Sequence, residues 1–346
     1  MLSNGFRMDI EWINPKKIRK QSENNAKTIR NMKAIILAGG FATRLWPLTE
    51  NKAKPLLHLK DKPLISHIVE KIPQNIEIIV STNAVFEEGF KKWAKNYSDR
   101  PLKIFVEDSA SDEFKKGALG ATAFVIEQKK INEDLMLLAG DNYFEFDMDA
   151  FINHFDENPL LAAYDIKDLA QAGKFGVVVQ REGHVHEFQE KPENPKSTLV
   201  STGCYIFPQR SLQDIIDYAK EKNDDLGGIF EYLLKKGEPI KVFRFDEKWI
   251  DIGSFDAYLQ ANRELIGNQI IEKDGVKKEG DNEFIGGIFL GNNVYIKDSV
   301  LDNVVVLKNC HIDNCVIRNC VIDENCTLKN LDLSHKMIRQ GSKIEK

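Results

Sequence analysis

The chain is 346 residues long and carries 48 Lys and Arg against 53 Asp and Glu, a formal net charge of −5. Hydrophobic residues make up 42% and charged residues 29%, which excludes a mainly disordered chain. The acidic balance argues against nucleic acid as the main partner, because such proteins need a basic face. No apolar run approaches the ~18 residues of a membrane span. We therefore expect a globular protein of about two domains, with neither nucleic acid nor a membrane as partner.

The five cysteines do not form the pattern of a disulfide scaffold, since four of them fall in one short region. This usage predicts a reducing, cytoplasmic setting. Residues 1–31 are polar and basic, and they contain neither sustained periodicity nor the apolar stretch of a signal peptide. We expect a poorly ordered N-terminal extension there. A second methionine, Met32, stands directly before the first predicted strand, which leaves open whether the extension belongs to the functional protein.

From Met32 the chain alternates short apolar runs with amphipathic stretches. Runs that stop at Gly, Asn or Asp predict strands, and apolar residues at i, i+3, i+4 and i+7 predict helices. The predicted elements are strands at 33–38, 76–80, 103–106 and 135–139 and helices at 64–72, 118–130 and 148–155. Antiparallel or mixed strands follow at 160–164, 176–180, 185–189 and 201–207, then helices at 211–220 and 254–266 around a strand near 240–245. This order predicts an α/β fold with a doubly wound, mostly parallel sheet.

From Ile285 onwards apolar residues recur at every fifth or sixth position, separated by Asn, Asp and Gly. A period near six is typical of a short parallel β-helix. We expect two or three coils over residues 283–332 and a tail over 333–346. Four cysteines each stand two residues before an apolar position: Cys310, Cys315, Cys320 and Cys326. Because no two are paired as in C-x₂-C, a buried ladder of small side chains is favoured over a zinc site.

The strongest local signal directly follows the first predicted strand and reads Leu37-Ala38-Gly39-Gly40-Phe41-Ala42-Thr43-Arg44-Leu45. In open α/β sheets, ligands bind at the carboxyl ends of parallel strands. The glycines let a phosphate or a base approach backbone N–H groups, and Arg44 offers a fork of donors suited to phosphate. The pattern is neither G-x-G-x-x-G nor Walker A. On its own it is equally compatible with a glycine turn beside a surface arginine.

Together with later blocks, this segment resembles the signature of the sugar-1-phosphate nucleotidylyltransferases, and among them the glucose-1-phosphate thymidylyltransferase-like enzymes. The resemblance rests first on Gly39-Gly40-x-x-Thr43-Arg44-Leu45-x-Pro47-Leu48-Thr49 and Lys54-Pro55-Leu56-Leu57. It continues in family order at 117–121, 140–142, 175–178, 190–192, 201–203 and 249–253. It implies a Rossmann-like mixed sheet of the nucleotidyltransferase type over residues 32–268, followed by a left-handed parallel β-helix of hexapeptide repeats.

The resemblance also implies a reaction in which a nucleoside triphosphate and a sugar 1-phosphate give a nucleotide sugar and pyrophosphate. The sugar phosphate attacks the α-phosphorus in line, so the protein must align two anions and stabilise the leaving group. By similarity, Arg44 holds the leaving pyrophosphate, Lys54 bridges the phosphates of both substrates, and Lys191 binds the sugar phosphate. Asp141 and Asp251, each at the end of an apolar run, are the implied Mg²⁺ ligands. A lone Asp in such a place is as often a helix cap.

The other implied site residues divide by substrate. For the sugar they are Asn142, Gly176, Glu190 and Thr202. For the nucleotide they are Leu37, Ala38, Gly39, Gly40, Thr43, Leu119 and Gly120. Gly120 stands where thymidylyltransferases often carry a base-reading glutamine, and His58 stands where a proline is common. The first expectation is dTTP with glucose 1-phosphate, and UTP- or GTP-dependent members of the same family are the alternatives.

Two further classes stay open. Some β-helices house acyltransferases, but His311 is the only histidine in the predicted repeats and has no supporting constellation. We therefore expect the coil to serve structure or assembly, with a homo-oligomer as the result. A non-catalytic regulatory subunit would have lost phosphate or metal ligands, whereas the implied cations and carboxylates are all present.

Overall fold

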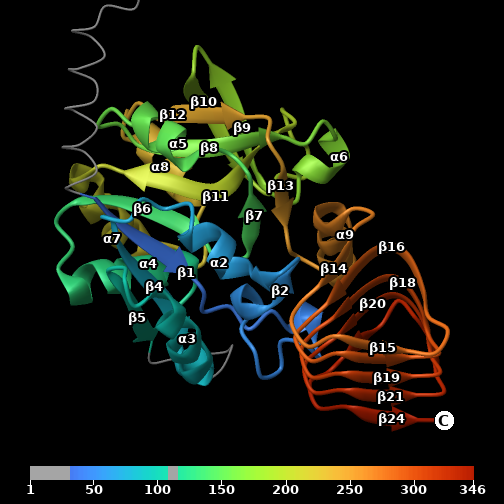
Figure 1. The fold of residues 1–346 in the computed structure, drawn as a ribbon. Helices are drawn as coiled ribbons and strands as arrows, with labels where there is room; N and C mark the ends of the chain where they lie inside the picture. The colour runs from blue at the N-terminus through green and yellow to red at the C-terminus, as the bar shows by residue number, and fades with distance from the viewer. Residues whose placement is uncertain (1–31, 108–115) are drawn as a thin grey trace, which may run out of the picture.

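The computed structural model describes residues 32–107 and 116–346, so the expected extension at 1–31 lies outside the described residues. Figure 1 shows an α/β unit and, beside it, a stack of short strands that begins at residue 270. Helix α9 (Phe255–Ile266) stands between the two. None of the described helices is long and apolar enough to span a bilayer.

A nine-stranded mixed sheet forms the middle layer of the α/β unit, in the order β5-β4-β1-β6-β11-β8-β12-β10-β9. Its strands are β1 (Met32–Leu37), β4 (Glu77–Asn83), β5 (Leu102–Glu107), β6 (Asp134–Ala139), β8 (Leu160–Asp165), β9 (Gly176–Arg181), β10 (His184–Glu190), β11 (Leu199–Phe207) and β12 (Lys241–Phe245). Strands β1, β4, β5 and β6 are parallel, and β11 is antiparallel to both β6 and β8. The predicted doubly wound mixed sheet is confirmed.

Alternate residues of the central strands face two separate cores, which explains their continuous apolar runs. In β1, Ala34 and Ile36 face one core and Ile35 faces the other. The first core is covered by α2 (Leu64–Val69), α3 (Glu87–Ala94) and α5 (Met148–His154). The second is covered by α4 (Ala118–Lys129), α7 (Leu212–Glu221) and α8 (Gly228–Lys235). Helices α3 and α8 are additions to the elements predicted from the sequence.

Shorter elements connect these layers. They are β2 (His58–Leu59), β3 (Lys62–Pro63), β7 (Asn142–Phe144), β13 (Trp249–Asp251), α6 (Leu169–Ala172), η1 (Thr43–Leu45), η2 (Lys54–Leu56), η3 (Ala84–Phe86), η4 (Lys95–Tyr97) and η6 (Gln209–Ser211). Strands β7 and β13 pair with each other outside the main sheet, and β2 pairs with β3. The β7–β13 pair matters for function because it joins segments that are far apart in the sequence.

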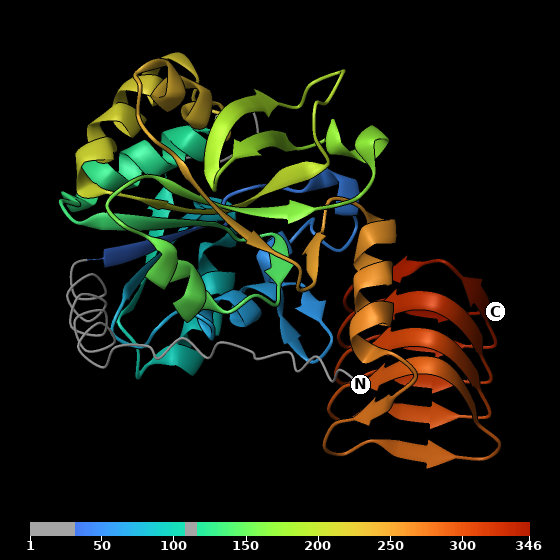
Figure 2. The ribbon, with the colours of Figure 1, turned by 90° about the horizontal axis from the view of Figure 1, so that it is seen from above.

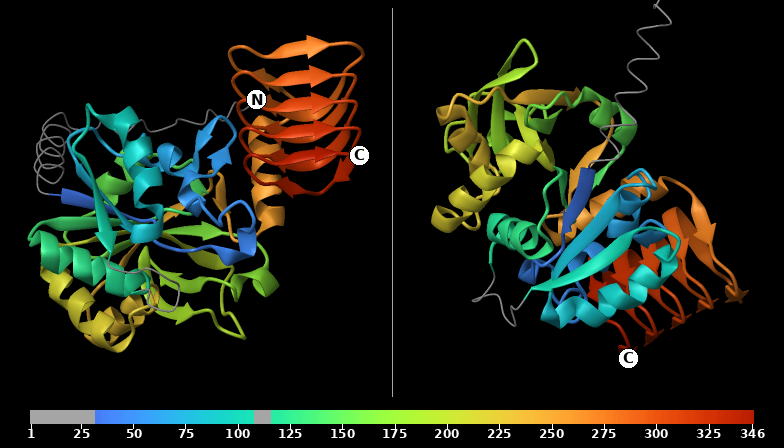
Figure 3. Two further views of the ribbon diagram at one scale, coloured as in Figure 1. Left: turned by 90° about the horizontal axis from the view of Figure 1, so that it is seen from below. Right: turned by 90° about the vertical axis from the view of Figure 1, so that its left-hand side faces the viewer.

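Residues 270–345 form a β-helix whose strands pair in parallel between successive coils (Figure 3). The strands are β14 (Ile270–Glu272), β15 (Lys277–Glu279), β16 (Glu283–Leu290), β17 (Tyr295–Lys297), β18 (Val300–Val306), β19 (His311–Asp313), β20 (Val316–Ile322), β21 (Thr327–Lys329), β22 (Asp332–Ser334), β23 (Met337–Ile338) and β24 (Lys343–Glu345). The predicted β-helix is confirmed, but the stack is longer than the predicted range 283–332. The expected tail at 333–346 contains β22 in part, β23 and β24. Backbone pairing holds the outer coils although many of their side chains are exposed, so apolar periodicity could not reveal them.

Asparagine recurs at the corners of the coils because these corners require the left-handed backbone conformation. Asn293, Asn309 and Asn325 have φ values of 57°, 59° and 61°, a region that Asn tolerates better than most residues. They stack at intervals of 16 residues, and each side-chain amide donates to the next, at 3.2 and 3.1 Å. The same residues therefore turn the chain and tie the coils together.

All four β-helix cysteines are buried. Their thiols lie against backbone carbonyls, for example Cys310 Sγ at 3.0 Å from the Asp323 oxygen and Cys326 Sγ at 3.1 Å from the Arg339 oxygen. Among the described residues, no group of three or more His, Cys, Asp or Glu side chains is placed to hold a metal ion. These contacts support the buried ladder rather than a zinc site.

One face of the β-helix packs against the α/β unit through apolar side chains. On this face Phe289, Val305 and Val321 point outward, and they share a core with Tyr258 and Ile266 of α9. Figure 2 shows α9 lying along the stack of coils. The α/β unit and the β-helix therefore share a hydrophobic core and form one packed body.

Replacing Val321 by Asp should strongly destabilise this junction. Val321 is 1% exposed, so the change removes apolar burial and buries a carboxylate without a partner, which costs on the order of 3 kcal/mol or more. Urea unfolding measures the loss. Ile285→Asp is the control, because Ile285 is 43% exposed. Equal losses in the two variants would contradict the packed junction.

Candidate active site

The carboxyl ends of β1 and β6 lie side by side and carry two of the predicted blocks. Leu37 pairs with Ala139, and the Gly140 N–H donates to the Leu37 carbonyl at 2.9 Å. A Cβ atom on Gly140 would lie 2.5 Å from that carbonyl oxygen, so this approach requires glycine. The glycine-rich loop and Asp141 therefore leave the sheet at the same edge, where ligands bind in open α/β sheets.

The β7–β13 pair brings Asp141 and Asp251 together. Asp251 pairs with Asn142, and the Ile252 N–H donates to the Asp141 carbonyl at 3.3 Å. Burial and the negative charge of Asp141 raise the pKa of Asp251 to about 6. A buried carboxylate beside a second carboxylate is stabilised when a cation joins them. The two predicted metal ligands are thus neighbours in the fold.

Three cations lie near enough to act on this acidic pair. Lys54 is buried, and its Nζ lies 2.8 Å from Asp141 Oδ2. Lys54, Lys191 and Arg44 all lower the pKa of Asp251 through their charge. The five residues predicted to be catalytic or metal-binding therefore converge on one place. Arg44 and Lys191 are exposed, so they can reach a ligand from solvent.

The donor set of the acidic pair fits Mg²⁺. Asp141 and Asp251 supply carboxylate oxygens, the ligand type that Mg²⁺ prefers. Asn142 Nδ2 donates to Asp141 Oδ1 at 2.9 Å and so orients that carboxylate. Mg²⁺ commonly takes one or two carboxylates and completes its octahedron with water and substrate phosphates. Two carboxylates with three cations nearby suit an ion of this kind.

A cavity of about 240 Å³ opens beside the acidic pair. All four residues predicted for the sugar line it: Asn142, Gly176, Glu190 and Thr202. Lys191 and Asp251 line it too, which connects the cavity to the cationic cluster. Its wall includes the irregular stretch of β11, where the pairing with β8 shifts between Ser201 and Tyr205.

Glu190 is a partly buried carboxylate in the wall of this cavity. Burial raises its pKa, and the charge of Lys191, 3.3 Å away, opposes that shift. A Cβ atom on Gly227 would lie 2.0 Å from Glu190 Oε2, and one on Gly176 would lie 3.2 Å from it. Glycine on both sides thus leaves room for the carboxylate. A carboxylate in this setting can accept hydrogen bonds from two ligand hydroxyls.

The predicted nucleotide residues after β1 differ in what they offer. The Ala38 N–H donates to the Ser81 carbonyl, and the Gly39 carbonyl accepts from Asn83 Nδ2, both at 2.8 Å. Gly40 and Thr43 are exposed, and a Cβ atom on Gly40 would meet no atom of the described residues within 4 Å. The open part of the loop therefore starts at Gly40, whereas the amide of Ala38 serves the sheet.

Leu119 and Gly120 lie in the first turn of α4. The Leu119 side chain is fully buried in the second core, and the Gly120 N–H donates to the Asn223 carbonyl at 2.8 Å. The amide of Gly120 is therefore already used within the protein.

Glu107, at the end of β5, was missed in the sequence. It is 5% exposed and accepts a hydrogen bond from Ser81 Oγ at 2.8 Å, and burial raises its pKa. A Cβ atom on Gly39 would lie 3.3 Å from its Oε1, so this carboxylate borders the glycine loop. The available signal was an acidic residue closing an apolar strand, the same pattern that marked Asp141.

Part of the cavity wall was missed as well. Leu226 and Gly227, between α7 and α8, line the cavity together with Trp249. Trp249 Nε1 is buried and has no hydrogen-bond partner among the described residues. For Leu226 and Gly227 the sequence did offer a signal, the Gly227-Gly228 pair before α8. Adjacent glycines indicate that another group approaches the backbone closely.

The family model described as Nucleotidyl transferase matches residues 33–268. The chain therefore belongs to the nucleotidyl transferase family.

Two relatives are similar to this chain over about two thirds of its length. The bifunctional protein GlmU of Methanocaldococcus jannaschii is 31% identical over 239 residues, covering 68% of this chain and 54% of its own length. The UTP–glucose-1-phosphate uridylyltransferase AglF of Haloferax volcanii is 29% identical over 229 residues, covering 64% of this chain and 91% of its own. This chain thus spans only about half the length of the first relative.

A solved structure of a putative glucose-1-phosphate thymidylyltransferase from Bacillus anthracis, in complex with sucrose, has the same fold. Its TM-score is 0.57 and its identity 26%, and the match covers 67% of this chain and 94% of that one. The names of the Haloferax and Bacillus proteins both specify glucose 1-phosphate but differ in the nucleotide, and the name of GlmU specifies neither.

Proposed function

We propose that this protein is a sugar-1-phosphate nucleotidylyltransferase, with the chemistry in residues 32–268. The observation that carries the proposal is the convergence of two carboxylates and three cations beside a polar cavity, at the carboxyl ends of β1 and β6. This arrangement can draw two phosphate-bearing anions together. The reaction needs no strong general base, because the phosphate of the sugar is already a nucleophile.

In this proposal each charged group acts on a stated part of the reaction. Lys54 has three donors and gives one to Asp141, which leaves two for phosphate oxygens. Lys191, beside the cavity, binds the phosphate of the sugar, and Arg44, on the exposed loop, binds the leaving pyrophosphate. Mg²⁺ held by Asp141 and Asp251 would neutralise charge on the triphosphate. Glu190 and Asn142 orient the sugar so that its phosphate lies in line with the α-phosphorus.

The first substrate pair in this proposal is dTTP with glucose 1-phosphate. The thymidylyltransferase structure supports it, and the uridylyltransferase relative supports UTP as the alternative base. A matrix of four nucleoside triphosphates against several hexose 1-phosphates, read by pyrophosphate release with and without Mg²⁺, separates these possibilities. Release that depends on a sugar phosphate and on Mg²⁺ is expected for at least one pair. A blank matrix would favour the non-catalytic regulatory class.

Glu190→Gln should weaken recognition of the sugar. The expected result is a KM for the sugar phosphate raised by about tenfold or more, because a hydrogen bond to a charged group contributes about 1.5–3 kcal/mol. The KM for the triphosphate should stay unchanged. Glu193→Gln is the control, since Glu193 is exposed in the loop that follows β10. A raised KM for the triphosphate instead would place Glu190 at the wrong substrate.

The β-helix is proposed to serve assembly as a homo-oligomer. Exposed apolar residues on it, Ile270, Ile285 and Ile344, support this. Light scattering on the full chain tests it, and a monomeric mass contradicts it.

The acyltransferase alternative would need His311 as a catalytic residue. His311 instead stacks on Tyr295, with ring centroids 4.5 Å apart. The free cysteines support a reducing compartment, which we propose to be the cytoplasm.

A further inference from the structure

The segment 43–57 carries both Arg44 and Lys54 but has little regular structure of its own. Its only helical turns among the described residues are η1 and η2, three residues each. A segment of this kind owes its position to contacts with the rest of the molecule. Residues 43–57 are called the catalytic segment below.

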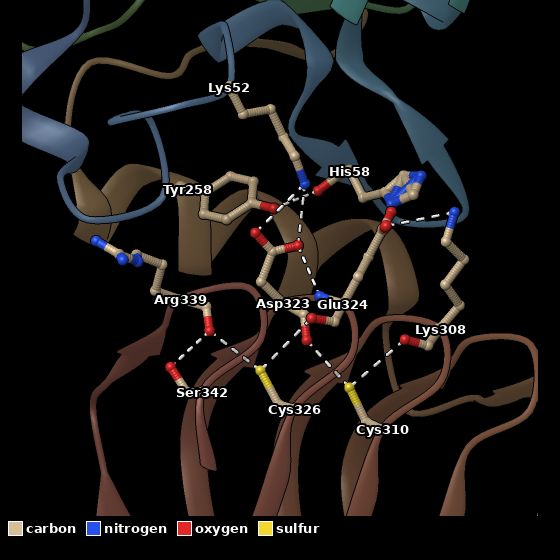
Figure 4. A network of polar contacts seen from close by, with 10 residues as sticks. All are labelled: Lys52, His58, Tyr258, Lys308, Cys310, Asp323, Glu324, Cys326, Arg339 and Ser342. Atoms are coloured by element: carbon tan, nitrogen blue, oxygen red, sulfur yellow. Dashed lines mark hydrogen bonds and ion pairs between the residues drawn. The ribbon is translucent and has the colours of Figure 1, made fainter. Parts of the chain in front are cut away.

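The β-helix supplies several of these contacts (Figure 4). Lys52 Nζ binds both carboxylate oxygens of Asp323, at 3.0 and 3.3 Å. Two residues before Lys52, Glu50 forms an ion pair with Arg339 of the β-helix. The catalytic segment also contributes Leu45, Leu48 and Leu57 to the core that it shares with the outward face of the β-helix. The β-helix therefore holds the catalytic segment in place through ion pairs and apolar packing, although the two are far apart in the sequence.

Asp323 is a rigid anchor for these contacts. Its side chain is 4% exposed, and its Oδ1 also accepts the Glu324 N–H at 2.8 Å. Its backbone N–H donates to the Ile338 carbonyl in the following coil, and its carbonyl accepts from Cys310 Sγ in the preceding one, both at 3.0 Å. Neighbouring coils on both sides thus fix the backbone that carries the carboxylate, and a carboxylate so buried needs a cation as partner.

Lys52 is that partner. His58, another basic group near this pair, is buried, and burial and the charge of Lys52 lower its pKa to about 4. His58 is therefore neutral at pH 7 and does not compete for Asp323. Its carbonyl accepts from the Tyr258 hydroxyl of α9, which secures the end of the segment to the same junction.

The Lys52–Asp323 pair lies two residues from the catalytic lysine. Ala53 between them is fully buried, and Lys54 opens η2 with its Nζ on Asp141. The backbone at 52–54 is thus held by the β-helix on one side and by the acidic pair of the active site on the other. A shift of the Lys52 backbone must move Lys54 as well, because only one residue separates them and backbone bond lengths are fixed.

We propose that Asp323 is a positioning residue for nucleotidyl transfer. Through Lys52 it fixes the catalytic segment, so that Lys54 and Arg44 are presented to the phosphates. This inference rests on the proposed function. It makes the β-helix a part of the catalytic apparatus as well as an assembly module.

The decisive comparison is Asp323→Asn against Glu324→Gln. Glu324 is the next residue and pairs with Lys308 within the β-helix at 3.3 Å, so its variant loses an ion pair without touching the catalytic segment. Asp323→Asn should lower kcat by about 10- to 100-fold, the scale of a misplaced catalytic group. The KM values should change little, since the cavity and the acidic pair are intact. Glu324→Gln should keep kcat within about twofold.

A double-mutant cycle with Lys52→Met shows whether the two residues act as one unit. The double variant should lose no more kcat than Asp323→Asn alone, because either change breaks the same link. Independent, multiplicative losses would overturn the proposal. The double variant should also melt at a higher temperature than Lys52→Met, which leaves the buried Asp323 unpaired.

Amide hydrogen exchange on the substrate-free protein gives a readout that does not depend on activity. Peptides from the catalytic segment should exchange faster in Asp323→Asn and unchanged in Glu324→Gln. If the wild type releases no pyrophosphate with any substrate pair, the proposed function fails, and exchange alone then decides whether the link exists. Unchanged exchange overturns it in that case. In an active wild type, unchanged kcat in Asp323→Asn overturns the positioning role.

Discussion

Asp251→Asn is expected to lower kcat/KM by about 10³-fold or more while the protein stays folded. The loss follows from removing one of the two carboxylates that hold the cation, an interaction with an expected contribution of several kcal/mol in the transition state. Pyrophosphate release under saturating Mg²⁺ measures it. Asp246→Asn, an exposed position three residues before β13, is the matched control and should retain wild-type rates.

The same variant should be at least as stable as the wild type at pH 7. The pKa of Asp251 is raised from 3.8 to about 6 in the folded protein, so its ionised form weakens the fold. The folded state therefore loses stability as pH rises from about 4 through 6, by up to about 3 kcal/mol. Asn carries no charge and removes that slope. Thermal melting of both proteins from pH 4 to 8 checks the sign.

A destabilised Asp251→Asn, with loss of activity explained by unfolding, would contradict the assignment. Near-normal turnover in a folded variant would contradict it more directly. Asp141→Asn should also abolish turnover with the fold intact, but it additionally weakens the partner of Lys54. Asp251 is therefore the cleaner position for the metal centre, and Asp141 reports on the metal and the lysine together.

The sequence predicted the α/β sheet from local patterns, whereas the convergence of the charged residues was implied by the family resemblance. An apolar strand that stops at glycine or aspartate marks the carboxyl end of a parallel strand, and Gly39, Gly140 and Asp141 all follow this rule. Parallel strands place such ends at one edge of the sheet. Family order then joined Asp251 to them, since nothing local connects Trp249–Asp251 with β6.

The outer coils of the β-helix, and its contacts with the catalytic segment, could not be predicted in this way. Lys52 and Asp323 are separated by 271 positions, and each looks like an ordinary surface charge in its own stretch of sequence. Only the packed junction of the β-helix shows that they meet. Glu107 was missed because it lies in none of the family blocks, although its local pattern is visible in the sequence.

Lys54→Met should reduce kcat by about 10²- to 10³-fold, because it removes a preorganised positive charge from a site where two anions meet. Methionine keeps the length and the apolar stem of the side chain. The fold should survive, because the Asp141 side chain is 41% exposed and can be hydrated when its partner is lost. The KM for both substrates should rise as well, since Lys54 lies between their expected phosphate positions. Steady-state kinetics at several Mg²⁺ concentrations measures both effects.

Lys62→Met is the control for this change, because Lys62 pairs with Glu70 away from the acidic pair. A loss confined to KM, with kcat unchanged, would show that Lys54 only binds substrate and does not act in the transition state. Full rescue by excess Mg²⁺ would show that a mobile cation can replace the lysine. The expected result is neither, because a lysine fixed by Asp141 on one side and by the β-helix through Lys52 on the other supplies its charge at one defined position.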